Sequence, residues 1–176
     1  MRFEAIALDG VWAVHPEPIR DNRGFFARTF CVNEFRAHGL EINFPQHSVS
    51  CSLLKGTVRG MHFQREPHSE VKLVGCVNGS IWDVVVDMRP RSSTFRQWRG
   101  FELSDENGLQ LYIPKGFAHG FQTLSDDVRV NYLISEFHAP NAAGGVRYDD
   151  PAFGINWPLP VSVISDKDLL WPAFAF

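Results

Sequence analysis

A succession of short β-patterned runs, each ended by a turn, constrains the fold more than any other feature of this 176-residue sequence. Between residues 46 and 135, alternating or continuous apolar stretches are separated by glycine, asparagine, aspartate or serine. Asn78-Gly79 joins two of these stretches, and Ser104 to Gly108 separates two more. We interpret both turns as β-hairpins. Short strands at this spacing predict an all-β domain, either a sandwich or a barrel.

The sequence contains few signals for helices and none for a second domain. NEFRAHG, residues 33–39, opens with an N-cap candidate and closes with a glycine, which predicts one short helix. After Ser135 the chain is rich in proline, glycine and aspartate, and we expect an irregular tail that wraps around the barrel. There is no internal repeat and no low-complexity linker, so the prediction is a single domain over residues 1–176.

Composition excludes several classes of partner. The net charge is -3 without a polybasic block, which argues against a nucleic-acid or anionic-membrane surface. No run approaches the about 20 apolar residues of a membrane span, and the amino terminus has no signal-peptide pattern. Three widely spaced cysteines suggest free thiols rather than disulfides or a zinc site. We therefore expect a soluble cytoplasmic protein with no membrane partner and no nucleic-acid partner.

The stretch GTVRGMHFQ, residues 56–64, places Arg59 and His62 in one predicted strand. Strict alternation would direct their side chains to opposite faces. Glycine inside a strand often marks a bulge, and one extra residue at Gly60 would turn both side chains toward a common cavity. The alternative is a surface arginine and a core histidine that bonds to a neighbour.

GLQLYIPKGFAH, which ends at His119, is similar to the second cupin motif. In metal-binding cupins, this histidine is joined by a His-x-His pair and a glutamate from the first motif. Here His62 is present, but Gln64 occupies the second histidine position, and Glu66 and Glu70 are misplaced. Two imidazoles and an amide make a poor transition-metal site. We expect no metal, and a metal-dependent isomerase or oxygenase remains the alternative.

Lys72 and Tyr132 are predicted to point into the barrel. Lys72 is in phase with Val74 and Cys76, and Tyr132 lies in a strand with the same alternation. A buried lysine or tyrosine is costly without a partner, and a bound ligand would provide one. The alternative for Tyr132 is a core tyrosine whose hydroxyl bonds to the backbone.

From about Asp21 to Asp168, the sequence resembles the dTDP-4-dehydrorhamnose 3,5-epimerase family of sugar-nucleotide epimerases in the cupin superfamily. The matching strings are DNRGFF, VRGMHFQ, KLVGCVNGSIWDVVVDMR, STFRQW, LSDENGLQLYIPKGFAHGF, GINWP and SDKD, in the family's order. The resemblance implies a cupin jelly roll, or double-stranded β-helix, with one or few short helices. It also implies a homodimer without a cofactor, which inverts carbon 3, carbon 5 or both in a nucleoside-diphospho-4-keto-6-deoxy sugar.

The resemblance assigns roles to particular residues. It makes His62 the base, Asp168 the carboxylate that orients it, and Tyr132 the acid. Asp83, in phase with two apolar neighbours, is the competing carboxylate for His62. The predicted substrate-binding residues are Arg23, Gln46, Ser48, Arg59, His119 and Lys167, and the partner subunit is an alternative source of Arg23.

The chemistry fits these residue types. A 4-keto group acidifies the hydrogens on carbons 3 and 5, so inversion needs a base on one face and a proton donor on the other. A histidine oriented by an aspartate suits the base. Lys72 is the candidate that places positive charge beside the developing enolate oxygen.

The sequence also departs from the family pattern. Arg28 and Ala143 replace family glutamates, and Phe137 and His138 stand where a tyrosine pair is often found. The sugar, the nucleotide and the number of inverted carbons are therefore left open. A non-catalytic sugar-nucleotide-binding cupin is the third hypothesis.

Overall fold

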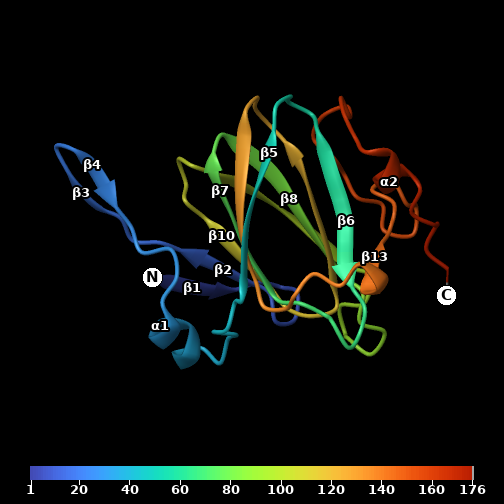
Figure 1. The fold of residues 1–176 in the computed structure, drawn as a ribbon, viewed down its shortest axis with the longest axis horizontal. Helices are drawn as coiled ribbons and strands as arrows, with labels where there is room; N and C mark the ends of the chain where they lie inside the picture. The colour runs from blue at the N-terminus through green and yellow to red at the C-terminus, as the bar shows by residue number, and fades with distance from the viewer. Residues whose placement is uncertain (176) are drawn as a thin grey trace.

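The computed structural model describes residues 1–175, which fold into two packed antiparallel sheets and a projecting hairpin (Figure 1). The first sheet has the order β1 (Arg2–Ala5), β2 (Trp12–His15), β10 (Gln110–Ile113), β7 (Lys72–Asn78), β12 (Val128–Ile134) and β5 (Gln46–Ser52). The second has the order β13 (Ala143–Gly145), β6 (Val58–Gln64), β11 (Phe117–Thr123), β8 (Ser80–Asp87) and β9 (Trp98–Ser104). The hairpin consists of β3 (Ile19–Asp21) and β4 (Gly24–Phe26).

Strands that are distant in sequence pair with one another. β5 pairs with β12, and β6 pairs with β11. This connectivity makes a double-sheet jelly roll, and it confirms the predicted all-β class. Apolar side chains from both sheets form the core between them, among them Val74, Val85, Leu111 and Phe121.

The two predicted hairpins are wrong. β7 and β8 flank Asn78-Gly79 but belong to different sheets, and the same holds for β9 and β10 around Ser104 to Gly108. Gly79 has φ +76°, a conformation that favours glycine, so the dipeptide does mark a sharp turn. In a jelly roll this turn carries the chain from one sheet to the other. A turn signal therefore does not determine which strands pair.

The helices are short. α1 spans Val32–Ala37, close to the predicted range, but its N-cap is Cys31 rather than Asn33. Pro140–Ala142 forms one 3-10 turn. α2 spans Asp166–Leu169, and its N-cap Ser165 accepts a hydrogen bond from the backbone N–H of Asp168. No helix among the described residues is long and apolar enough to span a membrane.

The carboxyl-terminal tail follows an irregular path over the second sheet, as predicted (Figure 1). Val146 and Phe153 from the tail pack against Met61 and Val84 of the sheet. Gln122 fixes the tail further, because its side chain both donates to and accepts from the backbone of Leu159. The tail thereby carries α2 to the edge of β6.

A buried carboxylate closes the end of β8. Asp87 is fully buried and accepts hydrogen bonds from Arg89, Ser92 and Thr94, including 2.8 Å to Arg89 Nε and 2.6 Å to Thr94 Oγ1. Burial acts to raise the pKa of Asp87, but these hydrogen bonds outweigh it and lower the pKa to about 2. Both carboxylate oxygens of Asp87 accept hydrogen bonds, so we assign this residue a structural role in the turn after β8.

We predict that Asp87→Asn lowers the free energy of unfolding by about 2 kcal/mol at pH 7. A lowered carboxyl pKa stabilises the fold above its unfolded value, near 3.8, and this contribution is lost as the pH falls toward 2. Denaturant titrations should therefore show the difference from wild type shrinking below pH 4. The control is Asp149→Asn, which breaks an exposed pair with Arg147 and should cost less than about 1 kcal/mol. An equal loss in both variants would contradict this account.

Candidate active site

A bulge in β6 lies at the centre of the site. His62 is paired with His119 on β11, and Arg59 with Phe121, so β6 carries one extra residue between these pairs. Gly60 has φ +137°, and a Cβ at this position would lie 2.6 Å from Cα of Gly120. Only glycine fits there. Because the bulge interrupts the alternation, Arg59 and His62 line the same cavity, as the sequence predicted.

His62 forms a close pair with Asp168, which α2 supplies from the tail. Nε2 of His62 lies 2.6 Å from Oδ1 of Asp168, and Oδ2 accepts a 3.3 Å hydrogen bond from the N–H of Gly60. The Asp168 side chain is 6% exposed, whereas that of His62 is 42% exposed. The half-exposed imidazole therefore lies between a buried carboxylate and open space.

The electrostatics of this pair define a base. Burial acts to raise the pKa of Asp168, but hydrogen bonds from His62 and Gly60 outweigh it, and the pKa is lowered. The ionised carboxylate accepts the Nε2 proton of His62, which leaves the lone pair on Nδ1. Nδ1 makes no hydrogen bond to any group in residues 1–175. It is the nitrogen available to take a proton.

A cavity of about 530 Å³ opens between the two sheets beside this pair. We call it the main cavity, and its size suits a small-molecule ligand. Eight of the predicted residues line it, namely Ser48, Arg59, His62, Lys72, His119, Tyr132, Lys167 and Asp168. Residues from β5, β6, β7, β11, β12 and the tail thus converge on one space.

A second cavity of about 220 Å³, the side cavity, shares His62, Lys72 and Lys167 with the main one. Gln46 lines only the side cavity, and its Oε1 accepts a 2.8 Å hydrogen bond from the N–H of His138. The predicted Gln46 therefore lies next to the site rather than within the main cavity.

Arg23 of this chain lines neither the main cavity nor the side cavity, and its place in a substrate site formed with the partner subunit stays a prediction. It sits at the turn of the β3–β4 hairpin, 85% exposed, and pairs with Asp21. Figure 1 shows this hairpin projecting away from the two sheets. A turn motif identifies the local structure, but it does not show where the whole hairpin points.

Tyr132 and Lys72 point inward as predicted. The hydroxyl of Tyr132 lies 3.2 Å from Oγ of Ser50, so its partner is a side chain and not the backbone. Burial raises the pKa of Tyr132, which keeps the phenol protonated and able to donate. Nζ of Lys72 lies 3.0 Å from Oε1 of Glu70, a pair that the sequence analysis missed. Its only sequence signal was that the two residues are two apart, because Glu70 lies in the loop just before β7 begins at Lys72.

Asp83 is the partner of a different histidine. Its Oδ1 lies 2.7 Å from Nε2 of His119, and both side chains are buried. The competing assignment of Asp83 to His62 is therefore wrong. The site holds two imidazole–carboxylate pairs, and only the one with His62 has a substantially exposed ring.

The side chain of Gln64 is used for structure. Its amide donates to the carbonyl oxygens of His68 and Phe137, and its Oε1 accepts from the N–H of Ala139. Within residues 1–175, no three His, Cys, Asp or Glu side chains form a group that could hold a metal ion. The donor set therefore fits poorly with the metal-dependent alternative.

The family model of dTDP-4-dehydrorhamnose 3,5-epimerase matches residues 5–175. The chain belongs to this family. A relative of that name from Methanothermobacter thermautotrophicus is 45% identical over 173 residues, which cover 97% of this chain and 92% of the relative.

Solved epimerase structures also superpose closely. The dTDP-4-dehydrorhamnose 3,5-epimerase of Bacillus anthracis, solved with TDP and PPi bound, is 38% identical with a TM-score of 0.96. The superposition covers 98% of this chain and 99% of that one. ChmJ, a 3′-monoepimerase of Streptomyces bikiniensis in complex with dTDP-quinovose, is 33% identical, with a TM-score of 0.89 and coverages of 96% and 85%. Both have the cupin-like fold that the sequence predicted.

This epimerase also places residues at its site that the sequence analysis missed. The ring of Trp171 lies 6.3 Å from that of His62, and Nζ of Lys167 lies 5.8 Å from the Trp171 ring. Trp171 lines the side cavity. The sequence signal for Trp171 was its position three residues after Asp168. A segment that places Asp168 at the site also places the residues next to it there.

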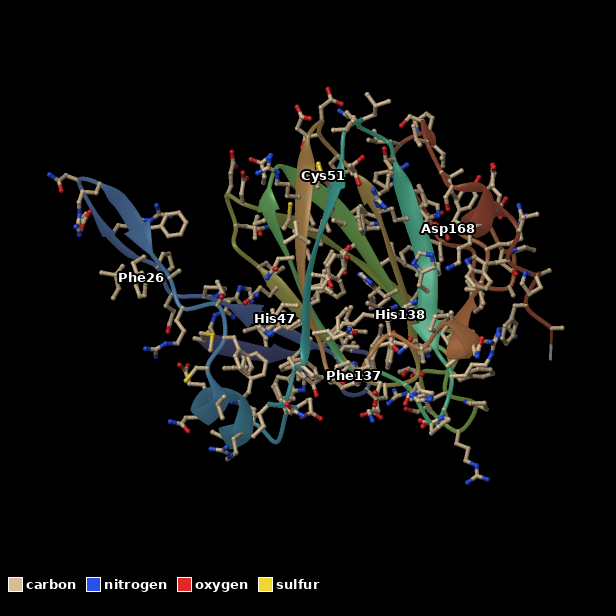
Figure 2. The ribbon with its side chains drawn as sticks, in the orientation of Figure 1. Phe26, His47, Cys51, Phe137, His138 and Asp168 are labelled. Carbon is tan, nitrogen blue, oxygen red and sulfur yellow. The ribbon has the colours of Figure 1, made fainter. Side chains whose placement is uncertain are left out.

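The departures from the family pattern lie at the edge of the site or outside it. Ala143 and His138 line the side cavity, and Phe137 is 61% exposed beside them (Figure 2). Arg28 lines neither cavity and lies 3.6 Å from Glu34 of α1. The main cavity therefore contains none of these four departures.

Proposed function

We propose that this epimerase inverts carbon 3, carbon 5 or both in a dTDP-linked 4-keto-6-deoxy sugar, without a cofactor. The observation that carries the proposal is the His62–Asp168 pair, which opens on a cavity that Tyr132 and Lys72 also line. Curated relatives named for the 3,5-epimerase support the substrate class. ChmJ is a 3′-monoepimerase, which supports inversion at a single carbon as one form of this activity.

The reaction proceeds through an enolate. Nδ1 of His62 takes the proton from a carbon next to the ketone, and the electron pair of the broken C–H bond moves onto the carbonyl oxygen. The ammonium of Lys72 stabilises the negative charge on that oxygen. The phenol of Tyr132 then protonates the same carbon from the opposite face, which reforms the ketone and inverts the centre.

Basic side chains around the main cavity suit the diphosphate of the substrate. Arg59 is held in place because its guanidinium donates to Oγ of Ser52 and to the carbonyl oxygen of Cys51. Lys167 lies at the boundary of the two cavities. Arginine and lysine both bind phosphate, and the planar arginine can bind two oxygens at once.

The test is solvent exchange in deuterium oxide. We expect the purified protein to incorporate deuterium at carbon 3 or 5 of a dTDP-linked 4-keto-6-deoxy sugar, as measured by NMR. Treatment with a chelator should leave the rate unchanged. Activity that disappears with the metal and returns with it would favour the metal-dependent alternative. Binding of the nucleotide sugar without exchange would favour the non-catalytic alternative.

We further propose that two copies assemble through the β3–β4 hairpin. Ile19, Phe25 and Phe26 expose 74%, 61% and 72% of their surface on this hairpin. Apolar groups so exposed on a projecting element favour a contact with another chain. The hairpin of the partner subunit would then bring its own Arg23 toward the main cavity of this chain.

We predict that Phe26→Glu converts the homodimer to a monomer, because a carboxylate would be buried in the interface. Light scattering after size-exclusion chromatography measures the mass. Leu53→Glu is the control, since Leu53 is similarly exposed (66%) but lies away from the hairpin. A wild-type protein that is monomeric at micromolar concentration would contradict the proposal.

We also propose that the chain is a single domain and that it is cytoplasmic. Both cavities are built from strands in the amino-terminal and carboxyl-terminal halves of the chain, which supports a single domain over residues 1–176. Cys31, Cys51 and Cys76 are free thiols. Free thiols are typical of the reducing cytoplasm, which supports a cytoplasmic location.

A further inference from the structure

We propose that Glu70 is a positioning residue that fixes the ammonium of Lys72 at the enolate oxygen. The inference rests on the proposed function, because it concerns the lysine assigned to that oxygen. It begins with the ion pair of 3.0 Å between Oε1 of Glu70 and Nζ of Lys72. The two side chains are 6% and 13% exposed, so neither is a solvated surface group.

The location of this pair matters because Lys72 lies where the two cavities meet. Lys72 and His62 line both cavities, whereas Glu70 lines only the side cavity. A lysine side chain has four flexible carbons, and its ammonium could extend into either space. Glu70 is its only ion-pair partner among the described residues. The carboxylate therefore restricts the ammonium to the boundary that it shares with His62.

The two oxygens of Glu70 are used unequally. Oε2 is buried and has no hydrogen-bond partner within residues 1–175. Asp87, the structural carboxylate at the end of β8, has partners for both of its oxygens. Burying an acceptor without a partner costs stability. Among the described residues, Lys72 is the sole ion-pair partner of Glu70. A carboxylate that is buried at such a cost is better explained by holding the lysine than by supporting the fold.

The pair also has a defined electrostatic consequence. A buried ammonium alone would be costly, and the carboxylate beside it offsets part of that cost. Charge that is already in place when the enolate forms requires no reorganisation at that moment. Glu70 thus acts on the reaction through Lys72 and does not itself contact the substrate.

The test is a double-mutant cycle with Glu70→Gln and Lys72→Met. Glu70→Gln keeps the shape of the side chain but removes its charge, and we expect kcat to fall by about 10- to 100-fold. The KM should stay within about threefold, because the residue acts on the reacting oxygen rather than on substrate affinity. In the Lys72→Met background, Glu70→Gln should cost no more than about twofold further.

Glu66→Gln is the control, since Glu66 is an exposed carboxylate on the same loop that bonds to Ser69 and lines neither cavity. Its kcat should match that of wild type. Multiplicative losses in the Glu70 and Lys72 cycle, or an unchanged kcat in Glu70→Gln, would overturn the inference. If Glu70→Gln does not fold, Glu70→Asp can replace it in the double-mutant cycle. The shorter side chain keeps the charge but moves the carboxylate away from Nζ of Lys72.

A crystal structure of Glu70→Gln separates this inference from the proposed function. We expect Nζ of Lys72 to leave its wild-type position or to occupy several positions. An unmoved Nζ would overturn the positioning role, whatever the activity. A wild-type protein that exchanges no proton on any 4-keto nucleotide sugar would overturn the proposed function, while a displaced Nζ would still support the positioning of Lys72 by Glu70.

Discussion

His62→Ala should reduce solvent exchange at carbons 3 and 5 by about 100- to 10,000-fold, because it removes the proposed base. The cavity should remain intact, since the imidazole is half exposed and its loss leaves no buried void. Deuterium incorporation followed by NMR measures the rate, and binding of dTDP by calorimetry tests whether the site survives. We expect the dissociation constant for dTDP to change by less than about tenfold.

His47→Ala is the matched control, because His47 lies on β5 and points away from both cavities (Figure 2). Its exchange rate should equal that of wild type. The single variant Asp168→Asn should also lose activity, as His62→Ala does. A neutral amide cannot stabilise the imidazolium as the carboxylate does. Exchange that persists in His62→Ala would place the base elsewhere, and the His119–Asp83 pair would be the next candidate.

The difference between the two imidazole–carboxylate pairs supports His62 as the base. A base must reach the substrate and must release its proton to solvent. The side chain of His62 is 42% exposed, whereas that of His119 is 6% exposed. His119 instead lies with its ring centre 6.3 Å from that of Tyr132. It therefore forms part of the wall around the phenol.

Much of the site was predictable because it depends on local geometry. Strand alternation placed Lys72 and Tyr132 inside, and the glycine at position 60 predicted the bulge that brings Arg59 and His62 together. Each of these predictions depends on a few neighbouring residues. The short-range rules of strands and glycine conformations are sufficient for them.

The predictions that failed depend on long-range arrangement. The Asn78-Gly79 turn leads from one sheet to the other, which the dipeptide cannot reveal. Asp83 and Asp168 were both reasonable partners for His62 by residue type, and periodicity alone did not separate them. Asp168 is 106 residues from His62 in the chain, and the packing of the tail joins them. The place of Arg23 also depends on long-range arrangement, since the direction of the β3–β4 hairpin is set outside it.

Tyr132→Phe should separate the two halves of the reaction. His62 and Lys72 remain, so the enolate still forms and protonation by the base returns the original configuration. Inversion should fall by about 100-fold or more, because the donor on the opposite face is gone. Deuterium exchange with retention should continue within about tenfold of the wild-type rate, since that step does not need the phenol.

The structure makes this variant a clean test. Tyr132 bonds to Oγ of Ser50 through its hydroxyl alone, so phenylalanine keeps the ring in place. Ser50→Ala serves as the control, because it removes the same hydrogen bond but leaves the phenol. Its inversion rate should stay within about tenfold of wild type. Chiral analysis of the product, run beside the deuterium measurement, distinguishes the outcomes. Equal losses of exchange and inversion in Tyr132→Phe would show that the phenol acts before the enolate forms, and would contradict the assignment of Tyr132 as the acid of the second step.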